Sequence, residues 1–174
     1  VVAYVLINGV DKLSLNLVFG EYTDNVPTVF PALVGTLQLV CIAAIIAVPI
    51  GVASAIFLVE YTNNKGKFVK IVQVATETLA GIPSIVYGLF GYLIFVVTFG
   101  WGYSMLAGGI TLAIMILPTI VRSTQESLIS VQSGLREGAY ALGTSKVRTI
   151  FKIVLPSAAG GIVTAIILAI GRVV

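Results

Sequence analysis

The sequence contains no histidine and a single cysteine, Cys41. Histidine is the usual general base of hydrolytic triads and the commonest metal ligand, and one cysteine cannot form an internal disulfide or a multi-thiolate metal site. A membrane-embedded phosphatase would need clustered His, Asp or Ser nucleophiles, and the sequence has no such cluster. We therefore expect no catalytic residues and no metal site in this chain.

Charged side chains are also scarce, at 10% of the residues, whereas apolar residues make up 58%. The mean hydropathy is +1.09, well above that of an ordinary soluble domain. Residues 25–59 contain no Asp, Glu, Lys or Arg, and this run exceeds the roughly 20 residues that a helix needs to cross a bilayer. The sequence therefore predicts an all-α polytopic membrane protein.

Four stretches are apolar enough to be membrane spans. They are expected at about 34–59, 82–99, 104–121 and 157–174. The apolar stretch that includes the second span is too long for one straight helix across a core of roughly 30 Å. We expect it to bend at Gly81-Ile82-Pro83-Ser84, with 66–80 as an amphipathic helix near the membrane surface.

Hydropathy and length predict an incomplete membrane helix at each end of the sequence. Residues 1–8 are apolar but too short to cross a bilayer, and the last span has no stop signal before Val174. We interpret 1–174 as a single transmembrane domain and as a fragment in which one helix is cut at each end.

Basic residues are concentrated in two connections between the spans. They are Lys65, Lys67 and Lys70 in one, and Arg122, Arg136, Lys146, Arg148 and Lys152 in the other. The positive-inside rule predicts that both connections are cytoplasmic, and the acidic residue Asp24 is expected on the opposite side. Topology alone explains the net charge of +3, so the charge does not indicate a nucleic-acid partner.

Small residues recur at four-residue spacing in two of the spans. They are Ala43, Ala47, Gly51 and Ala55 in one, and Gly161, Ala165 and Ala169 in the other. Such ridges let helices approach closely. They are typical of packing inside one bundle or of a contact with a second membrane subunit, and the pattern leaves both interpretations open.

The connection 122–156 is the most polar passage and is longer than two adjacent spans require. Leu135, Ala139 and Leu142 fall on one face of a predicted helix within it. Two glycines have the spacing of a phosphate-binding loop, but Thr144 stands where that motif requires Lys. The pattern indicates either a segment that contacts a partner or a solvated loop that only enforces topology.

A known signature runs through this connection. Glu137-Gly138-Ala139, Gly143 and Ile153-Val154-Leu155-Pro156 have the spacing of the EAA motif of ABC importer permeases, EAA-x3-G-x9-I-x-LP, with Gly138 in place of an Ala. The flanking segments GIPSIVYGLF, LPTIVRSTQESL and AIILAIGRVV also resemble the phosphate-specific permeases among them. This resemblance covers most of the chain from residue 34 onward.

The resemblance implies a MetI-like transmembrane domain of a type I ABC importer, located in the bacterial plasma (inner) membrane. It implies a second permease subunit, a cytoplasmic ABC ATPase dimer and an extracytoplasmic phosphate-binding protein as partners, besides the lipid bilayer. ATP would be bound by the ATPase, so the chain would be a non-catalytic subunit without a cofactor. The residues expected to couple it to the ATPase are Glu137, Gly138, Ala139, Gly143, Ile153, Leu155 and Pro156.

Arg172 is the first candidate for the substrate path. It lies about 15 residues into its span, or about 23 Å along the helix. A charge at this depth normally points into the bundle or a watery path, and a guanidinium offers paired donors suited to phosphate. The alternative is a structural ion pair, because in the family a Glu within a Gly-Glu-Thr triplet usually follows this Arg.

Arg122 and Glu126 are further candidates for the path. They occupy the region of the family's Arg-Thr-Thr-Glu pattern, although here Glu126 arrives one residue late. The alternative for Arg122 is that it extends to the cytoplasmic interface at the end of its helix. We interpret Glu77 as an interfacial residue that caps a helix or pairs with Lys70, and not as a ligand.

Two other functions remain open at this stage. Permeases for other oxyanions or small solutes share the EAA motif. The assignment of phosphate as the solute therefore depends on the resemblance of the flanking segments. A self-contained channel or secondary carrier would need neither an ATPase nor a docking segment.

Overall fold

The computed structural model describes residues 28–62 and 66–174, and the regular elements in these ranges are all helices. This confirms the predicted all-α class. The chain divides into two compact units, residues 1–38 and 39–174. Of the first unit, only 28–38 are described, and they contain the start of helix α3. The expectations for residues 1–8, Asp24 and Lys65 lie outside the described residues.

The helices follow one another with short connections, and several continue directly into wider, π-helical turns. In chain order they are α3 (Phe30–Ile56) with η1 (Phe57–Tyr61), α4 (Lys67–Ala80), α5 (Ser84–Gly91) with η2 (Tyr92–Thr98), α6 (Met105–Ile129), α7 (Ser133–Ala141), and α8 (Lys146–Thr149) with η3 (Ile150–Val154) and α9 (Leu155–Gly171).

Three helical runs are long and apolar enough to cross a membrane: Phe30–Tyr61, Met105–Ile129 and Lys146–Gly171. A fourth candidate is a bent pair in which α4 and the α5–η2 run meet at 95°. The bend lies at residues 81–83, where the sequence predicts it. Pro83 has no amide hydrogen to donate and disfavours a helical conformation in the residue before it, so a helix ends there readily.

Two helical runs extend beyond the apolar stretches that mark them in the sequence. Helix α6 continues past Val121 to Ile129, and the last run begins at Lys146 instead of near residue 157. Hydropathy reports where polar side chains begin, whereas backbone hydrogen bonds decide where a helix ends. The expected connection 122–156 therefore consists mostly of helix, with α7 between two turns.

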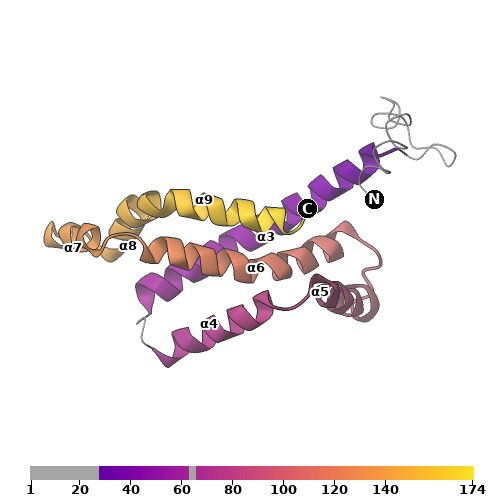
Figure 1. The fold of residues 1–174 in the computed structure, drawn as a ribbon, viewed down its shortest axis with the longest axis horizontal. Coiled ribbons are helices and arrows are strands. Elements are labelled where there is room, and N and C mark those ends of the chain that lie inside the picture. Colours follow the sequence, from indigo (N-terminus) through magenta and orange to yellow (C-terminus); the bar gives the residue numbers. More distant parts are fainter. Residues whose placement is uncertain (1–27, 63–65) are drawn as a thin grey trace, which may run out of the picture. The chain divides into compact units, whose positions relative to one another are not determined.

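Helix α6 is central to the packing of residues 39–174. Helix α9 lies along one side of it, and α4 lies along another (Figure 1). The fully buried side chains Ile116 and Ile120 of α6 form a core cluster with Ala43, Ala47 and Ala169. Helices α3 and α9 therefore meet α6 through their smallest residues.

Both small-residue ridges pack inside this bundle. A Cβ atom added to Gly51 would lie 2.7 Å from Ile120 Cγ2, and one added to Gly161 would overlap the Ser127 side chain. Ala55 and Ala165 are also buried. Of the two interpretations of these ridges, the structure therefore shows packing within the chain, which brings the helices close enough for their polar residues to meet.

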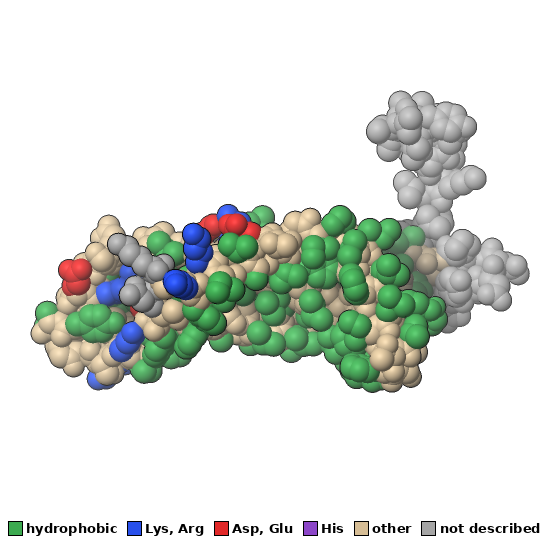
Figure 2. Space-filling model, turned by 90° about the horizontal axis from the view of Figure 1, so that it is seen from below, with side chains coloured by type: hydrophobic (Ala, Val, Ile, Leu, Met, Phe, Trp, Pro, Cys, Tyr) green, Lys and Arg blue, Asp and Glu red, His purple; other side chains and the backbone are tan. Residues whose placement is uncertain are grey.

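Charged side chains gather toward one end of the face in Figure 2, and hydrophobic side chains cover the rest of the described surface there. The start of α4 and helices α7 and α8 lie at the same end of the bundle (Figure 1). The basic residues Lys67 and Lys146 on these helices are exposed. This arrangement agrees with placing both basic connections on the cytoplasmic side of a membrane.

We expect Lys67→Cys and Lys146→Cys to react with an impermeant thiol reagent only when the cytoplasmic side is accessible. The background is Cys41→Ser, since the native cysteine is exposed and would also react. Labelling is measured in intact cells and in inverted vesicles. Reaction of position 146 in intact cells would contradict the topology.

Candidate functional site

Helix α7 carries the first half of the EAA signature and stands largely free of the bundle. Ala139 is its buried residue, at 5% exposure, whereas Glu137 and Gly138 are exposed. Leu135 and Leu142, which share a predicted face with Ala139, are 46% and 88% exposed. Leu135 and Ala139 therefore share a face of α7, as predicted, but only Ala139 is buried there, and α7 presents hydrophobic side chains to its surroundings.

Gly143 ends α7 by a specific turn. Its φ angle is +76°. The Gly143 amide donates to the Tyr140 carbonyl at 2.9 Å, and the Thr144 amide donates to the Ala139 carbonyl at 3.1 Å. This pair of bonds is the Schellman motif, in which the residue with positive φ is usually glycine. A Cβ atom added to Gly143 would meet open space, so the turn, and not a close contact, requires glycine here.

The second half of the signature lies in the turns that lead into α9. Ile153 and Leu155 are partly buried, and Pro156 stands in the first turn of α9, where its missing amide hydrogen is tolerated. Val154, the variable position of the signature, is fully buried and packs with Leu128 of α6. This half of the signature anchors the last span to α6.

Arg136 immediately precedes the signature, and in the sequence it stands out only as a basic residue of a connection. In the structure its Nε and Nη2 atoms donate to Glu60 Oε1 at 3.1 and 2.9 Å. Glu60 ends the long uncharged run of the sequence and lies in η1. An acid at the end of such a run could have indicated a paired charge, but its partner was not apparent.

Arg122 forms ion pairs with two carboxylates. Its Nε atom lies 3.2 Å from Glu126 Oε1, and its Nη1 atom lies 3.3 Å from Glu77 Oε1. The interpretation that Glu77 pairs with Lys70 is therefore wrong, because α4 packs against α6 and presents Glu77 to Arg122. The late position of Glu126 puts it four residues after Arg122, a spacing at which helical side chains meet.

These three side chains, with Gln125 among others, line a polar cavity of about 200 Å³ between α4 and α6. Each of the three charged side chains is more than half exposed, so the ion pairs contribute little to stability. Two carboxylates surround one guanidinium, so the cluster has a net charge of −1. An anion that approaches Arg122 would therefore also be repelled by the two carboxylates.

Arg172 lies just after the end of α9 and reaches across to α6 and α4. Its Nη1 atom donates to Thr119 Oγ1 at 3.0 Å, and its Nη2 atom donates to the Ala80 carbonyl at 2.9 Å. Ala80 is the last residue of α4, where carbonyls lack helical partners and carry the negative end of the helix dipole. Both partners are neutral, and within residues 28–62 and 66–174 no carboxylate pairs with Arg172.

The two arginine sites lie along one seam between α4 and α6. Thr119 and Arg122 are three residues apart on α6, and Glu77 and Ala80 are three residues apart on α4, so each pair lies on one helix face. The structure therefore brings the three path candidates predicted from the sequence to the same seam, at successive levels. Hydroxyl, carbonyl, guanidinium and carboxylate groups follow one another there.

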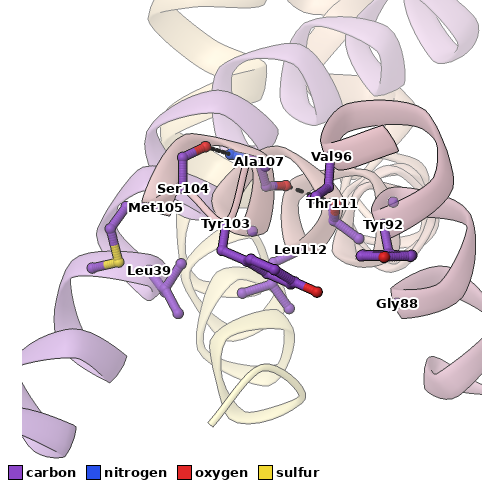
Figure 3. A pocket seen from close by; sticks show the side chains of 12 residues that line it. Leu39, Gly88, Tyr92, Val96, Tyr103, Ser104, Met105, Ala107, Thr111 and Leu112 are labelled. Carbon is purple, nitrogen blue, oxygen red and sulfur yellow. Dashed lines mark hydrogen bonds between the residues drawn. The ribbon is translucent and has the colours of Figure 1, made fainter. Parts of the chain in front are cut away.

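A larger cavity, of about 580 Å³, lies beside α5 and the start of α6 and differs in chemistry (Figure 3). Its lining is mainly apolar and includes the rings of Tyr92 and Tyr103. Ser104 Oγ accepts a hydrogen bond from the Ala107 amide, and Thr111 Oγ1 donates to the Ala107 carbonyl (Figure 3). Because the backbone uses these hydroxyls, the cavity suits an apolar occupant and not a phosphate ion.

No group of three or more His, Cys, Asp or Glu side chains in the described ranges is placed to hold a metal ion. Polar side chains line the cavity of the α4–α6 seam and also a cavity between α6 and α9, where Ser123, Ser127 and Thr164 lie.

Comparison with known proteins gives a consistent result. Residues 47–174 match the family described as binding-protein-dependent transport system inner membrane component. The chain is 43% identical over 146 residues to the phosphate transport system permease protein PstA of Mycobacterium leprae, covering 84% of this chain and 47% of the relative. It is 40% identical over 176 residues to the probable ABC transporter permease protein YqgH of Bacillus subtilis, covering 96% of this chain and 56% of the relative.

A third relative is the phosphate transport system permease protein PstA homolog of Mycoplasma pneumoniae. It is 38% identical over 185 residues, which cover 100% of this chain and 27% of the relative. The chain thus spans about half the length, or less, of the curated relatives that it matches. The family match and the apolar spans together show that the chain is a multi-pass protein of the bacterial inner membrane and belongs to the family of binding-protein-dependent transport system inner membrane components.

Proposed function

We propose that this chain forms part of the permease subunit of an ATP-driven importer, with inorganic phosphate as the solute. The observation that carries the proposal is helix α7. It holds the first half of the EAA signature, buries only Ala139 and, with the residue that follows it, exposes hydrophobic side chains such as Tyr140 and Leu142. An exposed hydrophobic face on a short, well-ended helix at the charged end of the bundle is suited to docking on a cytoplasmic partner.

That partner is a cytoplasmic ATPase, which binds ATP in place of this chain. In this proposal, the exposed residues Glu137 and Gly138 contact the ATPase, and Gly143 fixes the direction in which the chain leaves α7. The second half of the signature lies in η3 and the first turn of α9. In this proposal it holds the start of α9 in place, through Ile153, Leu155 and Pro156. The chain would couple hydrolysis to transport without a cofactor of its own.

Two arginines of the α4–α6 seam, Arg172 and Arg122, supply the positive charges for the substrate path. Arg172 keeps a planar guanidinium whose two described partners are neutral, so part of its donor capacity remains for an anion. Arg122, held between Glu77 and Glu126, would act at the next level along the seam. An anion could pass from one guanidinium to the other while the carboxylates prevent tight retention.

Phosphate is favoured over other solutes because two of the relatives are named as phosphate transport permeases. The remaining partners are then a second permease subunit that completes the path and an extracytoplasmic protein that delivers phosphate. Another oxyanion or small solute is the main alternative. A self-contained channel or secondary carrier is a further one, in which α7 would have no ATPase to contact.

The test is uptake of labelled phosphate into vesicles that contain the complete transporter. We expect uptake to require ATP and the binding protein, and to be competed by unlabelled phosphate far more strongly than by sulfate or molybdate. Stronger competition by sulfate or molybdate than by phosphate would show that phosphate is not the preferred substrate. Uptake that continues without ATP would instead support a channel or secondary carrier.

A further inference from the structure

A buried ion pair joins the end of the first described span to helix α7. Glu60 lies in η1, and Arg136 lies in α7, 76 residues further along the chain. Only 6% of the Glu60 side chain and 18% of the Arg136 side chain are exposed. The ion pairs of Arg122, in contrast, leave each side chain more than half exposed. Burial makes the Glu60–Arg136 pair sensitive to the loss of either partner, because the remaining charge would be uncompensated.

Arg136 also binds the main chain at the end of α6. Its Nη1 atom donates to the Val131 carbonyl and its Nη2 atom donates to the Leu128 carbonyl, both at 2.8 Å. Leu128 lies in the last turn of α6, and its carbonyl also accepts a long bond of 3.4 Å from the Val131 amide. One guanidinium therefore connects η1, α6 and α7. A lysine ammonium could keep the charge but lacks the planar fork that makes these bonds together.

Helix α7 has few other attachments to the bundle. It spans nine residues, of which Ala139 is buried. A helix of this length is not stable by itself in water, so its formation and direction depend on the contacts that hold it. The guanidinium of Arg136 provides the polar contacts between the body of α7 and the spans.

We propose that Glu60 and Arg136 are positioning residues that fix α7 to the spans and transmit its movement to η1 and α6. This inference rests on the proposed function, in which α7 docks on the ATPase. A rigid joint would convert a shift of α7 into a shift of two spans at once. A loose joint would let the ATPase move α7 alone, so ATP would be hydrolysed without transport.

The first test uses the complete transporter in vesicles, with ATP hydrolysis and uptake of labelled phosphate measured in the same preparation. In Arg136→Lys and in Glu60→Gln, we expect phosphate uptake per ATP hydrolysed to fall at least tenfold. In the double variant we expect no further fall, because both changes remove the same joint. The control is Lys70→Gln, which removes an exposed charge on α4 and should leave the ratio unchanged.

Arg136→Lys is the deciding variant if Glu60→Gln does not assemble, since it keeps a positive charge beside Glu60. A native ratio of uptake to hydrolysis in assembled Arg136→Lys would overturn the proposal. A double variant whose loss equals the product of the two single losses would also overturn it, because the residues would then act independently.

The second test needs no substrate. Spin labels are placed on the native Cys41 of α3 and on Ser133→Cys at the start of α7, both of which are exposed. In the assembled transporter, we expect a narrow distribution of distances between the labels and a broad one after Arg136→Lys. An unchanged narrow distribution would overturn the positioning role. If the distribution broadens but the native transporter takes up no phosphate, the positioning role stands and only the proposed substrate is wrong.

Discussion

Replacement of Gly143 by tryptophan is expected to abolish association with the ATPase while the chain still inserts into the membrane. Gly143 has a φ angle of +76°, a conformation that costs an L-residue roughly 1–2 kcal/mol. The position next to it is open, so a tryptophan side chain would project from the end of α7 into the space that the docked partner needs. The backbone strain at position 143 and the bulk of the tryptophan side chain would therefore both disturb the end of α7 that docks on the ATPase. The measurement is the amount of ATPase that co-purifies with the permease.

Two further variants separate the strain from the bulk. Gly143→Asn adds a small side chain of a residue type that tolerates positive φ, so we expect most ATPase to be retained. Gly134→Ala adds a methyl group to another glycine of α7 with open space around it but no positive φ, and should be neutral. Full co-purification of the ATPase with Gly143→Trp would rule out a coupling role for the α7 turn.

Loss of Arg172 is expected to stop transport more than it disturbs assembly. Arg172→Leu should leave at most a few per cent of native phosphate uptake in an assembled complex, because it removes the guanidinium that lies between Thr119 and the end of α4. Arg172→Lys keeps the charge but cannot hold both partners and an anion at once, so we expect uptake to fall at least tenfold. Assembly and uptake are measured in the same membranes.

Thr119→Val is the matched control for a purely structural role of Arg172. It removes the hydroxyl that accepts the bond from Nη1 but keeps the guanidinium and its bond to Ala80. If Arg172 serves transport, this variant should keep most uptake. Assembly failure in Arg172→Leu, or a loss in Thr119→Val as large as that in Arg172→Lys, would show that Arg172 only fastens α4 and α9 to α6.

The sequence by itself determined the class of protein and several local features. Hydropathy predicted the membrane spans, since a long uncharged run has few other stable environments. Gly81 and Pro83 together predicted the bend, because proline lacks an amide hydrogen and disfavours a helical conformation in the residue before it, and glycine permits the turn. Gly143 adopts a positive φ at the turn after α7, a conformation that glycine reaches without steric cost. Each of these properties depends on the residue itself or on its immediate neighbours.

The ends of α6 and of the last run could not be placed from hydropathy. Arg122 and Glu126 are polar, but they continue the helix because their backbone groups bond as those of any helical residue do. The point where side chains turn polar and the point where backbone bonding stops are different physical boundaries.

Only the tertiary structure decided which charges meet. Glu60 and Arg136 are 76 residues apart, and Arg172 reaches a carbonyl 92 residues earlier in the chain. The packing of α4 and α9 on α6 sets the contacts of Arg172, and the approach of η1 and α7 to the end of α6 sets the Glu60–Arg136 pair. A local pattern in the sequence does not carry this information, because the partner of each charge depends on which helix faces lie against one another.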